Sequence, residues 1–172
     1  MPVIRGFALS LAVVAALYTF SPRTAGQDAQ ADPAAQIQVA NELFESARYQ
    51  EALDAYNLAI QSSDTALVTR ARKGKVRTAL RVAEFDLARA EAETLNEGAG
   101  ADAEAQTLLG DALWGNGLFD EADTAYRRAL ATEPESSRAR FGLARSLATR
   151  SRLDEALTES LQTATLASQD PE

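Results

Sequence analysis

The sequence of 172 residues contains no cysteine and no histidine. Without cysteine, the chain can form no disulfide, thiolate zinc site, iron–sulfur cluster or lipid-modified cysteine. Without histidine, it lacks the commonest general base and the commonest transition-metal ligand. The sequence also has no P-loop, no dinucleotide-binding glycine string and no nucleophile-elbow motif. We therefore expect neither an enzyme nor a cofactor-binding protein.

Aromatic residues are scarce, at 6%, although 46% of all residues are hydrophobic. Most of these are Ala and Leu, which form helices well because they lose little rotamer freedom there. Alternating clusters of β-branched and aromatic residues, the usual sign of strands, are missing. The net charge of −8 argues against nucleic-acid binding, because phosphates require a basic face. The composition therefore predicts an all-α protein.

Residues 1–31 differ from the rest of the chain. Arg5 precedes an apolar stretch over residues 6–20, and small residues with a helix breaker follow, ending in Ala-Gln-Ala at 29–31. This is the layout of a secretory signal peptide with its cleavage site. The alternative is a retained hydrophobic helix acting as a membrane anchor, although 15 residues are fewer than the roughly 20 that span a bilayer. Either reading predicts an exported protein, in the bacterial periplasm or anchored in the cytoplasmic membrane with the remainder outside.

The remainder of the chain contains an internal repeat. Alanines recur at Ala52, Ala88, Ala122 and Ala156, spaced by 36, 34 and 34 residues. Each lies in a similar string, such as "YQEALDAY" and "FDEADTAY". The two residues by which the first spacing exceeds 34 are expected in the loop at 62–64. Such a period is typical of stacked helical hairpins, in which neighbouring units bury a core that one unit could not bury alone.

The segment at 103–136 resembles a tetratricopeptide repeat. Its small and large residues lie at that family's core positions, among them Gly110, Gly117, Tyr126 and Pro134. The resemblance implies a right-handed α-solenoid of about four helix–turn–helix units over 32–170, with a tail at 171–172. The expected repeats are 33–66, 69–102, 103–136 and 137–170.

In this register, each first helix carries a small residue where the second helix crosses it, and each second helix begins with a large one. The small residues are Ala40, Val76, Gly110 and Ala144, and the large ones are Tyr49, Phe85, Phe119 and Leu153. In the last helix Ser160, Thr163 and Ser168 replace apolar core residues. We interpret them as the polar cap that the end of a solenoid requires.

The resemblance also implies a concave groove lined by the first helix of each repeat. The groove residues that we single out are Asn41, Phe44, Arg70, Lys73, Arg77, Trp114, Arg138, Phe141 and Arg145. Six cations fall within Arg70–Arg81, and they would attract an acidic partner. The alternative is a solvated face balanced by acids on neighbouring helices. The three aromatic residues could anchor a partner or only pack against the next helix.

The family's carboxylate clamp of Lys and Asn residues is incomplete here. Asn41 matches one clamp position, but Ile37 replaces the preceding lysine and Asp111 replaces a later asparagine. We expect another protein as partner, held in the groove through an acidic segment, with no nucleic acid and with membrane contact only through residues 1–31. The alternative function is a permanent structural subunit of a membrane-bound complex. The sequence leaves the oligomeric state open.

Overall fold

The computed structural model describes residues 32–97 and 101–169. The signal or anchor segment predicted at 1–31 and the tail at 171–172 lie outside these ranges. Within them the chain forms eight helices and no strand: α1 (Pro33–Glu45), α2 (Tyr49–Ala59), α3 (Thr65–Arg81), α4 (Phe85–Glu97), α5 (Ala103–Gly115), α6 (Phe119–Thr132), α7 (Ser137–Thr149) and α8 (Leu153–Gln169). None of the helices described is long and apolar enough to cross a membrane.

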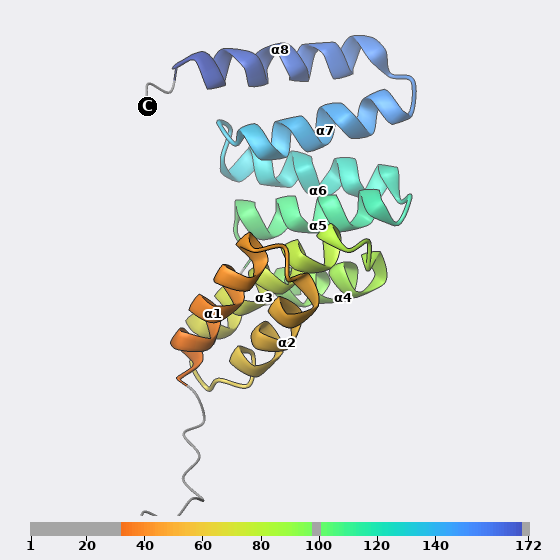
Figure 1. Ribbon diagram of the computed structural model, residues 1–172. Coiled ribbons are helices and arrows are strands. Elements are labelled where there is room, and N and C mark those ends of the chain that lie inside the picture. Colours follow the sequence, from red (N-terminus) through yellow and green to blue (C-terminus); the bar gives the residue numbers. More distant parts are fainter. Residues whose placement is uncertain (1–31, 98–100, 170–172) are drawn as a thin grey trace, which may run out of the picture.

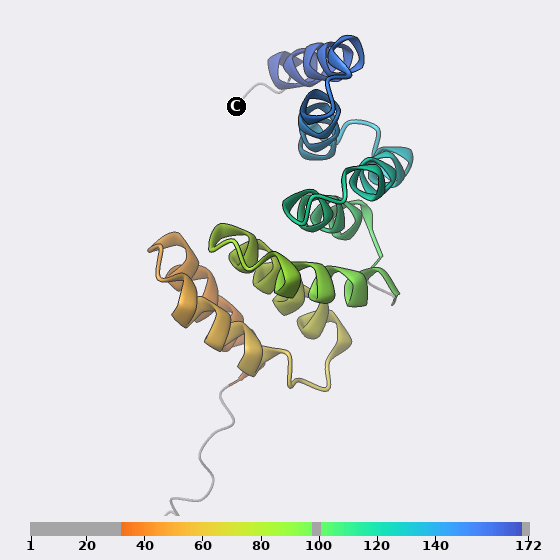
Figure 2. The same cartoon turned by 90° about the vertical axis from the view of Figure 1, so that its right-hand side faces the viewer.

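The helices form four antiparallel pairs stacked into a solenoid, which confirms the predicted fold class. Each helix packs on the next one, and α1, α3, α5 and α7 also pack on one another in that order. Figure 1 shows α5–α8 as one stack, with α1–α4 turned relative to it, so that the array twists. Figure 2 shows the helices nearer end-on, with α8 closing one end of the array.

The first helix of every pair begins at a capping side chain. Asp32, Asp64, Asp102 and Ser136 each accept a hydrogen bond from a backbone N–H in the first turn of α1, α3, α5 and α7 respectively. Such caps satisfy N–H groups that have no partner within the helix. Because α3 begins at Thr65, it has one additional helical turn at its N-terminal end when it is aligned with α5 and α7. Asp64, which the sequence analysis assigned to a loop, is the residue that fixes this start.

The turn inside each pair contains one residue in the left-handed region. These residues are Ala47, Ala83, Gly117 and Ser151, with φ of 57°, 59°, 76° and 58°. All four pairs therefore share the same kind of left-handed turn between their two helices. Glycine adopts this conformation without steric cost, whereas other L-residues do so at some expense. The second helices then begin at the predicted residues, Tyr49, Phe85, Phe119 and Leu153.

The recurring alanines occupy the closest helix crossings. Ala52, Ala88 and Ala122 have no exposed surface, and Ala156 is 7% exposed. The predicted small residues Ala40, Val76 and Ala144 are buried as well, and Gly110 faces the ring of Tyr126. The recurring small residues therefore lie where the two helices of a pair approach most closely.

The junctions between repeats use two different packing pairs. At the first and third junctions a tyrosine, Tyr56 or Tyr126, lies against a glycine of the following helix, Gly74 or Gly142. The second junction has Ala92 and Leu108 at the same positions, both fully buried in one cluster. A large residue therefore meets a small one at every junction, but at the second junction the large residue is on the other helix. This exchange keeps the spacing of the helices while the sequence changes.

The end of the array at α8 differs from the predicted polar cap. Ser160 and Thr163 turn their hydroxyls back to carbonyls of their own helix. However, Leu153, Leu157 and Leu161 are 65%, 59% and 60% exposed. Leu153, the large residue that begins this second helix, is mostly exposed because no following helix covers it among the residues described.

Candidate partner-binding groove

A cavity of about 490 Å³ lies along the predicted groove, between α1, α3, α5 and α7. It is lined by Phe44, Arg77, Leu80, Arg81, Phe85, Asp111, Trp114, Arg138 and Arg145. Five of these nine residues belong to the set predicted from the sequence. Four arginines and a single aspartate supply all of the charge of the lining, so this cavity is basic although the whole chain is acidic.

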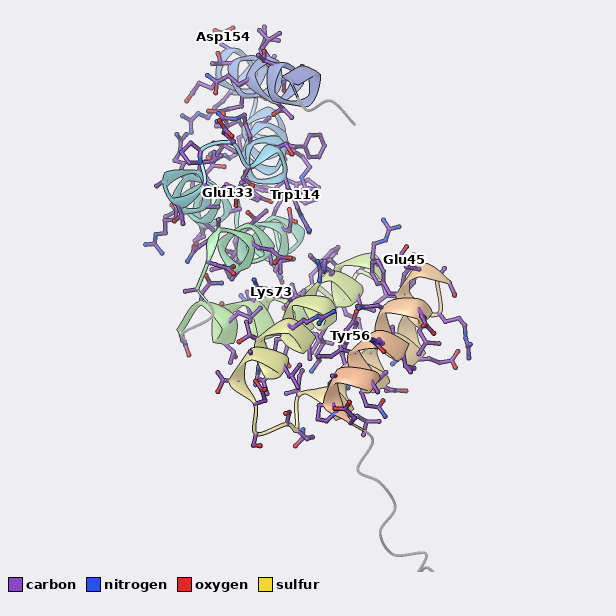
Figure 3. The ribbon with its side chains drawn as sticks, turned by 90° about the vertical axis from the view of Figure 1, so that its left-hand side faces the viewer. Glu45, Tyr56, Lys73, Trp114, Glu133 and Asp154 are labelled. Atoms are coloured by element: carbon purple, nitrogen blue, oxygen red, sulfur yellow. The ribbon has the colours of Figure 1, made fainter. Side chains whose placement is uncertain are left out.

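The other predicted residues lie around two neighbouring hollows. Arg70 and Lys73 line one of about 630 Å³ at α3 and α5, and Asn41 lines a smaller one at α1 and α3. Arg77 lines all three spaces and therefore stands at the centre of the groove. Phe141 lines none of these three, but its side chain is 60% exposed on α7. Figure 3 labels Lys73 on α3, in the α1–α4 part of the array, and Trp114 on α5, in the α5–α8 part.

Trp114 is held between helices rather than projecting freely. The guanidinium carbon of Arg145 lies 3.9 Å from the centroid of its ring, a cation–π contact across α5 and α7. The ring of Phe119 lies 6.4 Å away at a tilted angle. Trp114 Nε1 is buried and has no hydrogen-bond partner among the residues described. Trp114 thus packs against the next helix and also lines the cavity, and its role as an anchor for a partner stays a prediction.

Asp111 organises the arginines at the wall of this cavity. Its carboxylate accepts hydrogen bonds from the Tyr126 hydroxyl at 2.8 Å and from Arg138 and Arg145, each at 3.0 Å. Burial raises the pKa of the Tyr126 hydroxyl, and the adjacent Asp111 carboxylate raises it further. Tyr126 therefore remains a neutral donor at any physiological pH. The aspartate that breaks the family's carboxylate clamp here holds two cations in fixed positions.

A second group of ion pairs joins α3 to α5. Lys73 Nζ lies 2.5 Å from Asp102 Oδ2 and 3.0 Å from Glu104 Oε2, while Arg77 Nη1 lies 3.1 Å from Glu104 Oε1. Burial lowers the pKa of Lys73, but hydrogen bonds to the two carboxylates outweigh it, so the pKa is raised overall. Burial raises the pKa of Asp102, but the hydrogen bonds that its carboxylate accepts from Lys73 and from the Ala105 N–H outweigh this effect. The pKa of Asp102 is therefore lowered overall.

The six cations of α3 therefore do not form a single free surface. Arg72 and Lys75 turn away from the groove and pair with Glu91 on α4, at 2.5 and 2.6 Å. Lys73 and Arg77 are paired with acids of α5, as described above. Arg70 and Arg81 have no ion-pair partner in the part of the chain that the structure describes, and Arg81 lies over the ring of Tyr49 at 5.9 Å. Part of the basic stretch is thus balanced by neighbouring acids, and part remains open.

Four residues that line the cavity lie outside the set singled out from the sequence, namely Leu80, Arg81, Phe85 and Asp111. Phe85 was assigned only to the start of α4. Arg81 was counted among the cations but not among the groove residues. Its spacing of four from Arg77 places both on one helix face, and this signal could have identified it. No group of acidic, histidine or cysteine residues able to hold a metal ion occurs at 32–97 or 101–169.

Comparisons with known proteins agree with this architecture. The tetratricopeptide repeat family model matches residues 107–171. Among solved structures, MamA from Desulfovibrio magneticus RS-1 superposes with a TM-score of 0.69 at 23% identity, over 81% of this chain and 78% of that one. MamA of MSR-1 gives 0.63 at 19% identity, over 81% and 79%.

A third solved structure is YrrB, described as a tetratricopeptide-repeat protein with an unusual peptide-binding site. It superposes with a TM-score of 0.62 at 22% identity, over 78% of this chain and 69% of that one. No curated protein matches the sequence. The stacked hairpins and their inner groove define an α-solenoid of helical repeats. Residues 107–171 match the tetratricopeptide-repeat family model, and the residues described share the fold of these solved structures.

Proposed function

We propose that the chain is a non-catalytic interaction module that captures an acidic segment of another protein in its concave groove. The observation that carries this proposal is the cavity that combines the ring of Trp114 with four arginines and a single acid, Asp111. A tryptophan and arginines in a partly enclosed pocket are the residue types that dominate binding energy at interfaces. YrrB, whose description names a peptide-binding site, shares the fold and lends support by analogy.

The ion pairs indicate how such a partner would be held. Arg145 and Arg138 are positioned by Asp111, so their side chains are already ordered before a ligand arrives. Preordered side chains reduce the entropy lost on binding. Arg81 and Arg70 are exposed and have no acidic partner among the described residues, so they can receive carboxylates of the ligand. The basic groove on an acidic protein would also steer an acidic segment toward it.

We further propose that the module works in the cell envelope, exported by residues 1–31. The support is the sequence of that segment, with one arginine before 15 apolar residues and small residues after them. Sequencing the N-terminus of the protein purified from its native cells tests this proposal. A start at residue 32 indicates a cleaved signal peptide, whereas a start at Met1 in a membrane fraction indicates an anchor. An unprocessed protein in the cytosolic fraction would contradict export.

Photo-crosslinking in native cells tests partner capture. Phe141 is replaced by a photoreactive phenylalanine analogue, and Leu58 on α2 serves as the matched control. The two side chains are 60% and 61% exposed, but on an inner and an outer helix. We expect position 141 to crosslink one defined protein that position 58 does not, and mass spectrometry then identifies it. Equal crosslinking from both positions would refute the groove as the binding site.

Charge reversal then tests the acidic chemistry. The double variant Arg70→Glu and Arg77→Glu should abolish capture of the crosslinked partner while circular dichroism shows unchanged helicity. Arg127→Glu with Arg128→Glu on α6 is the control, because it changes the net charge equally at exposed residues outside the groove. If both variants lose the partner equally, the overall charge and not the groove determines binding. If neither does, the groove hypothesis is wrong.

A further inference from the structure

An apolar face on the last helix is left uncovered. Leu153, Leu157 and Leu161 of α8 are each about three-fifths exposed, at 65%, 59% and 60%. Because they are spaced by four, they follow one another along one side of the helix. Ser160 and Ala164, which lie beside them on that side, carry no charge. Single exposed leucines are ordinary, but a continuous row of them marks an interaction surface.

Two of these leucines, Leu153 and Leu157, stand at positions that contact the following repeat elsewhere in the array. Leu153 corresponds to Tyr49, Phe85 and Phe119. The Phe85 ring reaches Gly115 of the next pair, Arg81 lies over Tyr49, and Ser146 donates a hydrogen bond to the Phe119 carbonyl. Leu157 corresponds to Leu53, which is 3% exposed and packs with Val76 and Ala79 of α3. The α8 helix therefore presents the outer face of an interior repeat.

The opposite end of the array does not fit this face. In the following repeats, the residues that meet the preceding pair are small or turned inward, such as the buried Ala71, Gly74 and Thr78 of α3. The residues of α1 at the same positions are Ala35, Gln38 and Glu42, and all three are exposed. Pressing a row of leucines onto Gln38 and Glu42 would remove an amide and a carboxylate from water without partners. Head-to-tail stacking of two copies is therefore disfavoured.

We propose that the leucine face of α8 pairs with the same face of a second copy of this chain, about a two-fold axis near Leu157. An uncharged apolar row is complementary to itself, which is the requirement of a two-fold interface. The 17 residues of α8 span about 26 Å at 1.5 Å per residue. A stable pair must bury about 1,200 Å² in total, so the contact must use the whole length of α8. The groove between α3, α5 and α7 remains open in such a dimer, which presents two copies of it.

The association is measured by analytical ultracentrifugation of the full chain in mild detergent, over a range of concentrations. We expect a monomer–dimer equilibrium, and a loss of affinity of at least about tenfold for Leu157→Glu with Leu161→Glu. Leu58→Glu on α2 is the matched control, since Leu58 is equally exposed but stands alone. Circular dichroism must show the same helicity for all three proteins. A monomer at every concentration, or a dimer unaffected by the α8 changes, overturns the proposal.

Disulfide trapping then tests the two-fold geometry, and the natural absence of cysteine makes it clean. Leu157→Cys alone should give an oxidised dimer on a non-reducing gel, because a residue near a two-fold axis meets its own copy. A second variant combines Leu157→Cys with Gln38→Cys on α1. Trapping that occurs only in this double variant indicates head-to-tail stacking and overturns the two-fold arrangement. Trapping of neither variant, or of Leu58→Cys as efficiently as Leu157→Cys, overturns it as well.

Discussion

The ring of Tyr126 on α6 occupies the space directly over Gly142 on α7. A Cβ atom at position 142 would lie 2.4 Å from Cε1 of Tyr126, well inside van der Waals contact. The Tyr126 hydroxyl is fixed by Asp111 and Arg145, so the ring cannot easily move aside. This contact sets the distance between the third and fourth repeats. It also couples the packing of the core to the arginines that line the groove.

Gly142→Ala should therefore destabilise the protein by about 1–3 kcal/mol, the usual cost of overpacking. Guanidinium denaturation followed by circular dichroism measures the change. The second junction indicates how to compensate for it, because Leu108 there meets Ala92. Gly142→Leu combined with Tyr126→Ala should be less destabilised than the sum of the two single variants. Strict additivity would show that the two residues are not coupled.

The left-handed turns offer a way to stabilise the array. Ala83→Gly should raise the free energy of unfolding by up to about 1 kcal/mol, since glycine removes the strain of a positive φ at some cost in unfolded-chain entropy. Ala47→Gly should act alike, as φ at the two residues is 57° and 59°. Gly117→Ala is the reverse control and should destabilise. Denaturation midpoints that fall in the Ala→Gly variants would contradict this account of the turns.

Asp102→Asn should weaken the protein over the pH range in which Asp102 is ionised and Lys73 is protonated. The folded-state pKa of Asp102 is lowered, so its contribution to stability is present above the unfolded value, about 3.9, and is lost as the pH falls through the folded value. Lys73, whose pKa is raised, contributes below its unfolded value of about 10.4. Asparagine can still cap α5, so the change removes mainly the charge.

Thermal melts of the wild type and Asp102→Asn at several pH values measure this difference. The wild type should be the more stable between about pH 4 and pH 10, and the two curves should converge as the pH falls through the lowered folded-state pKa of Asp102. Asp32→Asn, a cap without an ion pair in the described structure, controls for the capping effect. A gap between wild type and Asp102→Asn that does not narrow as the pH falls below the unfolded value of about 3.9 would show that the ion pair with Lys73 is not its cause.

Ala122→Trp should unfold the second half of the array. Ala122 has no exposed surface and packs in one cluster with Tyr126, Leu143 and Leu147. An indole placed there must displace a neighbouring helix, which we expect to cost more than about 3 kcal/mol. The equivalent change at an exposed residue of the same helix, Thr124→Trp, should have little effect. An unchanged melt of Ala122→Trp would refute the register.

The residues whose positions could be predicted from the sequence are those that the repeat period fixes. Ala52, Ala88 and Ala122 recur with the period of the hairpin because every crossing requires a small residue, so the spacing can be read without coordinates. Phe44, Arg77, Trp114, Arg138 and Arg145 were found for the same reason, since a repeat register fixes which helix face a residue occupies. Whether each of the nine residues binds a partner stays a prediction.

The all-α class, the hairpin register and the helix face of each groove residue are readable from the amino-acid sequence, because they follow from periodicities along the chain. Which charges remain open depends instead on contacts between helices. Glu91 neutralises Arg72 and Lys75, and Glu104 binds Lys73 and Arg77, across helices that are 16 to 31 residues apart in sequence. The exposed leucines of α8 are also visible only in the fold. A residue at an interior position is buried only if a neighbouring helix is present to cover it, and no local pattern records that.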